Sequence, residues 1–164
     1  MKSTTAVMFP IGLLLLGVLG QAQSPAADPK LRSAIGEAIQ QARSLRKTQE
    51  AILAALVEKK ASREMLAKQI AVTEEALRTL QGAIEKIDEQ YDSLSEPRQS
   101  AVRDAWSTVK LFGVLFDYLK EAATKPDSKE RDDDLISHAT STTRRAVQLD
   151  ESLSLLNTQC RPQS

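Results

Sequence analysis

The chain has 164 residues, of which 41% are hydrophobic and only 4% are aromatic. A single cysteine excludes an internal disulfide framework, and a single histidine excludes a histidine-rich metal site. The 22 basic residues balance the 22 acidic ones, so the sequence lacks the positive charge typical of nucleic-acid binding. The hydrophobic fraction indicates a folded chain, and the low aromatic and glycine content favours helices over strands.

Residues 1–22 have the pattern of a secretory signal peptide, so we expect the mature chain to begin at Gln23. Lys2 gives the positive start, residues 11–19 are apolar, and Gly20 and Ala22 are the small residues before the cleavage point. The apolar run is shorter than the ~20 residues that span a bilayer, which favours cleavage over a membrane anchor. We therefore predict a secreted protein, extracellular or in a bacterial periplasm, with no transmembrane segment in the mature chain.

Residues 31–94 carry apolar residues alternately three and four positions apart, which is the heptad pattern of a coiled coil. Two core positions of this pattern hold cations, Lys59 and Arg63, which are costly to bury without partners. A helical hairpin that turns near residue 61 would expose them, and so would one continuous rod. Small and apolar flanking residues favour the hairpin, whereas the absence of glycine and proline at this point favours the rod. We predict the hairpin.

Two later helices have clearer boundaries. Ser95 and Pro97 mark the start of a third helix, and Asp127 with Glu130 forms a capping-box pattern for a fourth. The predicted fold class is all-α, an antiparallel four-helix bundle with a long coiled-coil-like hairpin over residues 31–94. The expected single domain covers residues 23–160, followed by a tail at 161–164. Its expected helices span about 29–60, 62–94, 96–124 and 128–158.

The third helix holds four of the five aromatic residues that follow the signal peptide, and residues 109–119 are apolar nearly all round. One interpretation is a core helix that its neighbours bury on most sides. The other is an apolar surface kept for a partner, a lipid or a membrane. The candidate partner-binding residues are Trp106, Phe112, Phe116 and Tyr118. Gly113, in the middle of this helix, predicts a close helix crossing or a flexible point.

Other chemistry-bearing residues are few. Cys160 follows the fourth helix and is a candidate for an interchain disulfide, the alternative being a free thiol. His138 lies near the acidic residues 132–134. We interpret these three carboxylates as complementing the positive N-terminal end of the fourth helix. The sequence contains no catalytic or phosphate-binding motif. We therefore assign no catalytic residues, cofactor or metal.

These patterns predict an exported, non-enzymatic helical protein that acts by protein–protein interaction, with a homodimer as one form of it. The alternative is an amphipathic helical protein that opens its bundle on a lipid or membrane surface. Its polar faces, however, show no strong excess of basic residues. A small helical enzyme is the third hypothesis, and it requires basic groups inside the bundle, for which Lys59 and Arg63 are the candidates.

Overall fold

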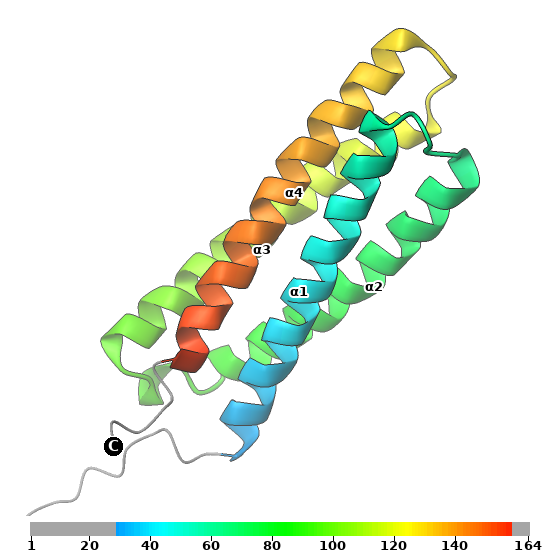
Figure 1. Cartoon of the computed structure of the whole chain (residues 1–164). Coiled ribbons are helices and arrows are strands. Elements are labelled where there is room, and N and C mark those ends of the chain that lie inside the picture. Colours follow the sequence, from blue (N-terminus) through cyan, green and yellow to red (C-terminus); the bar gives the residue numbers. More distant parts are fainter. Residues whose placement is uncertain (1–28, 159–164) are drawn as a thin grey trace, which may run out of the picture.

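The computed structural model describes residues 29–158. Its α-helices are α1 (Pro29–Val57), α2 (Arg63–Asp88), α3 (Glu96–Thr124) and α4 (Lys129–Thr158), and a short 3-10 helix, η2 (Tyr91–Ser93), lies between α2 and α3. The predicted all-α class is confirmed, because four helices pack side by side and the described residues include no strand (Figure 1). The expected signal peptide, the C-terminal tail and Cys160 lie outside the described residues.

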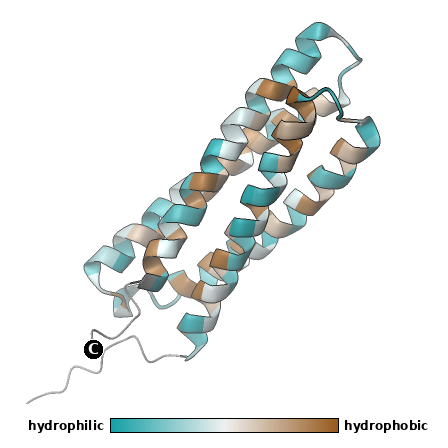
Figure 2. Ribbon diagram, viewed as in Figure 1, coloured by the Kyte–Doolittle hydropathy of each residue, from teal (hydrophilic) through white to brown (hydrophobic). Residues whose placement is uncertain are grey.

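The four helices surround a common core. Helix α1 packs against α2 and α4, and α3 packs mainly against α4. Helices α2 and α3 contact each other much less than these pairs do. In Figure 1 the α1–α2 and α3–α4 links lie together at one end of the bundle. Hydrophobic and hydrophilic residues recur in turn along each helix (Figure 2), which lets each helix direct an apolar stripe inward.

The heptad pattern correctly places its apolar residues in the core on both sides of the break at residues 58–62. The buried members in α1 are Leu31, Ile35, Ala38, Ala42, Leu45, Ile52 and Leu56, and those in α2 are Leu66, Leu80, Ile84 and Ile87. Helices α3 and α4 contribute Val109, Phe112, Phe116, Leu119, Leu135, Leu149 and Leu153. Burial of one large apolar side chain stabilises a fold by about 1.5–3 kcal/mol, so this core is the main source of stability.

The chain turns at residues 58–62 instead of continuing as a rod. The turn is a Schellman motif, in which the Lys60 N–H donates to the Ala55 carbonyl at 2.8 Å and the Lys59 N–H donates to the Leu56 carbonyl at 3.1 Å. Lys59 adopts the left-handed conformation, with a φ of 55°. Glycine usually fills this position because it has no Cβ. The absence of glycine therefore did not indicate a rod here, since a lysine makes the turn.

Both cations of the heptad pattern lie on the surface beside this turn. Lys59 and Arg63 are exposed, so neither one is a basic group inside the bundle. Ser62 begins α2 by accepting a hydrogen bond from the Met65 N–H at 3.1 Å. Burial of Lys59 and Arg63 in the core would be costly. Both stay in contact with solvent because α1 ends at Val57 and α2 begins only at Arg63.

The end of α2 differs from the prediction. The helix ends at Asp88, not near residue 94, and the chain then passes through η2 before α3 begins. Leu94 leaves the helical conformation and is extended, yet it is only 6% exposed. The heptad pattern thus predicted the burial of Leu94 correctly and its helical conformation wrongly, because a core contact can be made from a link as well as from a helix.

Candidate interaction surface

The aromatic residues of α3 lie on different faces of the helix. Phe112 and Phe116 are buried, and their ring centroids lie 5.8 Å apart. Trp106 is half-buried, and Tyr118 is 51% exposed. The prediction that all four form one partner-binding surface is therefore wrong for Phe112 and Phe116. The helical period turns these two rings toward the other helices, where they fill the core.

A second apolar stripe on α3 faces solvent. We call Leu111, Val114 and Tyr118 the outer stripe; they are 39%, 52% and 51% exposed. Their spacing of three and four residues places them on one face of the helix. The sequence prediction named Tyr118 but missed Leu111 and Val114. Leu111, Val114 and Tyr118 have helical spacing in the sequence. However, the residues of the buried stripe alternate with them in 109–119, so the sequence alone does not separate the two stripes.

Charged residues border the outer stripe. Arg103, Lys110 and Asp117 are exposed and seven residues apart, so they form one line along the side of the helix. This line is basic at its first two positions and acidic at the third. Asp104 and Glu121, both exposed, are acidic at the two ends of the stripe itself.

Helix α4 supports one edge of the outer stripe. The rings of Tyr118 and His138 are stacked, with centroids 5.7 Å apart and an interplanar angle of 22°. His138 is half-buried and thus packs as part of this edge. Over residues 29–158, no three His, Cys, Asp or Glu side chains are grouped so that they could hold a metal ion.

Gly113 faces open space. A Cβ atom built on Gly113 would meet no atom within 4 Å, so the prediction of a close helix crossing is wrong. Gly113 lies seven residues from both Trp106 and Lys120, which places the three residues on one face of α3. Trp106 and Lys120 line two hollows where α2 and α3 meet. The glycine thus lies on the helix face that borders the groove between α2 and α3.

The α2–α3 groove holds an apolar hollow of about 350 Å³. Its apolar lining consists of Leu66, Ala67, Ile70, Ala71 and Ala123. The Lys120 ammonium bridges the two helices by binding Glu74 at 3.0 Å, and it also binds Asp117 at 2.9 Å. The hydrogen bond to Asp117, followed by the one to Glu74, raises the pKa of Lys120. This ion pair therefore persists at neutral pH across the groove.

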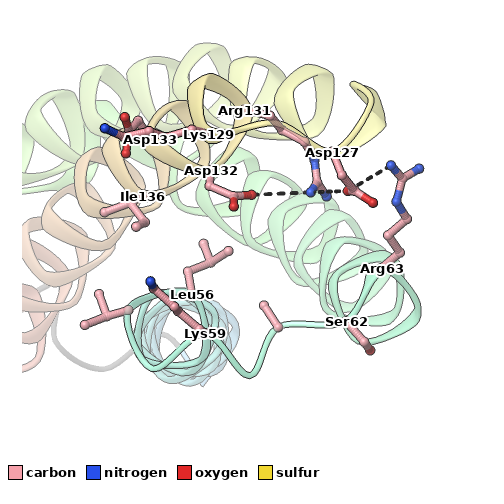
Figure 3. A pocket seen from close by; sticks show the side chains of 12 residues that line it. Leu56, Lys59, Ser62, Arg63, Asp127, Lys129, Arg131, Asp132, Asp133 and Ile136 are labelled. Atoms are coloured by element: carbon pink, nitrogen blue, oxygen red, sulfur yellow. Dashed lines mark hydrogen bonds and ion pairs between the residues drawn. The ribbon is translucent and has the colours of Figure 1, made fainter.

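A larger hollow, of about 690 Å³, lies where the α1–α2 and α3–α4 links meet (Figure 3). A chain of ion pairs crosses it. Asp127 binds Arg63 at 2.9 Å and Arg131 at 2.6 Å, and Arg131 contacts Asp132 at 3.4 Å. The Arg63 guanidinium is the main cause that lowers the pKa of Asp127. Arg131 is only 7% exposed, so the buried cation of this region is Arg131 and not the predicted Lys59 or Arg63.

Some of the charges of this hollow pair with one another, although the buried Nε of Arg131 has no hydrogen-bond partner among the described residues. Its basic lining residues are Lys59, Arg63, Lys129 and Arg131, and its acidic ones are Asp127, Asp132 and Asp133. The arginines bind carboxylates of the same hollow. Arg63 also donates a hydrogen bond to the Lys125 carbonyl at 3.3 Å. We therefore interpret these contacts as interactions that hold the α1–α2 link against the α3–α4 link.

A polar cluster crosses the core, and sequence reasoning missed it. The Gln49 amide donates to the Thr73 hydroxyl at 3.0 Å, and the Thr142 hydroxyl donates to the Gln49 side-chain oxygen at 2.7 Å. All three residues are 0% exposed. Gln49 and Thr73 occupy core positions of the heptad pattern, and Thr142 lies on the inner face of α4. Their pairing depends on tertiary contacts between α1, α2 and α4.

No family model, no curated protein and no solved structure matches this chain. Between residues 29 and 158, none of the helices is both long and apolar enough to cross a membrane. The function of the chain is therefore inferred from the geometry of the described residues, and chiefly from the outer face of α3.

Proposed function

We propose that this chain is an exported helical-bundle protein that acts by binding another protein, not by catalysis. The observation that carries the proposal is the outer stripe of α3. Three large apolar side chains stay exposed on one helix face although the same helix buries its other apolar stripe in the core. Grouped apolar side chains with a charged margin are typical of protein-binding surfaces. The signal-peptide pattern of residues 1–22 supports the export part of the proposal.

The proposal includes an antiparallel order of the four helices. Lys86, near the end of α2, binds Glu37 near the start of α1 at 3.1 Å. Lys120, near the end of α3, binds Glu74 in the first half of α2. The short links between consecutive helices favour the same order. In such a bundle α3 has one face in the core and one face available to a partner.

Site-specific photo-crosslinking tests the binding surface. A benzoylphenylalanine residue is placed at Val114 in the full-length chain, in the organism that produces the protein, and the matched control carries it at the exposed Lys68 of α2. We expect a defined protein adduct from position 114 and none from position 68. Equal adducts from both positions, or none from either, would contradict the proposal.

The export step has its own measurement. Mass spectrometry of the protein recovered outside the cytoplasm should give an N-terminus at Gln23. A chain that stays in the cytoplasm with Met1 or Lys2 at its start would refute export but would leave the surface on α3 in place.

The α2–α3 groove supports a second candidate function, binding to a lipid surface. Helices α2 and α3 contact each other less than α1 and α2, α1 and α4, or α3 and α4 do, and an apolar hollow between them is lined by Glu74 and Lys120, which form an ion pair. Separation of α2 from α3 would expose the apolar faces that an interfacial helix needs. Flotation with neutral and with anionic vesicles tests it: the candidate requires bound protein in at least one case, and a protein that remains at the bottom of both gradients rejects it.

A further inference from the structure

We infer that the partner on the outer stripe is a second copy of this chain, with the two α3 helices paired antiparallel. The inference rests on the proposed function and specifies its partner. It comes from the order of charges along one side of the outer stripe, basic at Arg103 and Lys110 and acidic at Asp117. A line of side chains whose two halves carry opposite charge is complementary to itself after a twofold rotation.

The spacing of the apolar residues defines the register of this pair. The rotation that sets Leu111 of one copy against the partner's Val114 also sets Val114 against the partner's Leu111. In the same register Tyr118 lies against the partner's Ser107, a small residue that leaves space for the ring. The outer stripe then covers itself along about two helical turns, which removes its large apolar side chains from water.

The same register brings opposite charges together at the margin. Lys110 lies beside the partner's Asp117, and the twofold axis repeats this pair. At the two ends of the stripe the same register places Asp104 near the partner's Glu121, so the Lys110–Asp117 contacts are the ones that favour this order. A parallel arrangement in register would instead place Lys110 beside the partner's Lys110, and Asp117 beside the partner's Asp117. Like charges disfavour the parallel arrangement, so the charge order selects the antiparallel one. Asp117 also keeps its contact with Lys120 of its own chain, at 2.9 Å.

Charge exchange tests the pair directly. In the chain from residue 23 to 164 with Cys160→Ser, the single variants Lys110→Glu and Asp117→Lys each place like charges together twice. Each is expected to weaken the dimer about tenfold in sedimentation equilibrium. The double variant Lys110→Glu/Asp117→Lys restores opposite charges and should recover the original dissociation constant within about threefold.

The recovery is informative because residues 110 and 117 lie about 10 Å apart along one helix and do not pair within a chain. Melting temperatures measured beside the dissociation constants separate dimer loss from unfolding. A double variant that is as weak as the single variants, or single variants that dimerise normally, would overturn the antiparallel pair.

The crosslinking experiment separates this inference from the proposed function. If position 114 crosslinks to a different protein while the purified chain stays monomeric, the second-copy inference fails and the proposed function stands. If position 114 gives no adduct and the purified chain is monomeric, both fail.

Discussion

Replacement of Gln49 separates the packing role of this buried side chain from its polar role. Gln49 is 0% exposed and joins Thr73 of α2 to Thr142 of α4. Each threonine hydroxyl also has an acceptor in its own helix. Thr73 donates to the Gln69 carbonyl at 2.8 Å, and Thr142 lies 3.1 Å from the His138 carbonyl. Loss of the Gln49 amide therefore leaves both hydroxyls with a hydrogen-bond partner.

Two substitutions at Gln49 have different expected costs. Gln49→Ala removes two buried hydrogen bonds, at about 1 kcal/mol each, and leaves a cavity, so we expect a loss of about 3 kcal/mol in the free energy of unfolding. Gln49→Met keeps the length of the side chain and removes the buried amide. Its cost should stay within about 1 kcal/mol, because the partners remain satisfied and an apolar replacement avoids desolvation of the amide.

Urea unfolding followed by circular dichroism measures both variants against the original chain. The Ala variant should also lower the melting temperature by about 10 °C. A Met variant that loses as much stability as the Ala variant would refute the reasoning, because it would show that the three-residue hydrogen-bonded cluster itself is a major stabilising element.

Three further predictions follow from local geometry. Gly113→Ala should stabilise the protein by about 1 kcal/mol in the same assay, because a Cβ at this position meets no atom within 4 Å; a destabilised variant would show that the space is needed. Lys59→Gly should raise the free energy of unfolding by about 1 kcal/mol, since φ is 55° in the Schellman turn, and an unchanged value would contradict the strain argument. The hydrogen bond from Arg63 is the main cause that holds the folded-state pKa of Asp127 below its ordinary value of 3.8. Asp127 therefore contributes its full share of stability above about pH 4. This contribution is lost as the pH falls through the lower folded-state pKa. The stability difference between the original chain and Asp127→Asn should therefore be constant from about pH 5 to 7 and shrink in more acidic solution; a difference that grows on acidification would refute the assignment.

The sequence predicted the core better than it predicted the links between helices. Apolar periodicity follows directly from the helical period, so the residues that face inward in α1 and α2 were identified on both sides of the break. The turn at Lys59 was not marked by glycine because a lysine adopts the left-handed conformation here, in a turn closed by the backbone hydrogen bonds of Lys59 and Lys60. The end of α2 at Asp88 was also missed, because Leu94 satisfies the apolar pattern from an extended link.

The candidate surface was only partly predictable for a related reason. Composition identified α3, but two apolar stripes overlap in its sequence, and only the placement of neighbouring helices shows that Phe112 is buried while Val114 is exposed. The contact between Arg63 and Asp127 depends on the meeting of two links that are far apart in the sequence. Such pairings follow from tertiary structure and leave no local pattern.

Light scattering across a concentration series tests most directly the claim that a second copy covers the outer stripe. The chain from residue 23 to 164 is compared, under reducing conditions, with Val114→Asp and with Val72→Asp, a matched control because Val114 is 52% exposed on α3 and Val72 is 44% exposed on α2. We expect a reversible dimer for the original chain and for Val72→Asp, and a monomer for Val114→Asp. A monomer at every concentration for the original chain, or equal behaviour of the two variants, would contradict this claim.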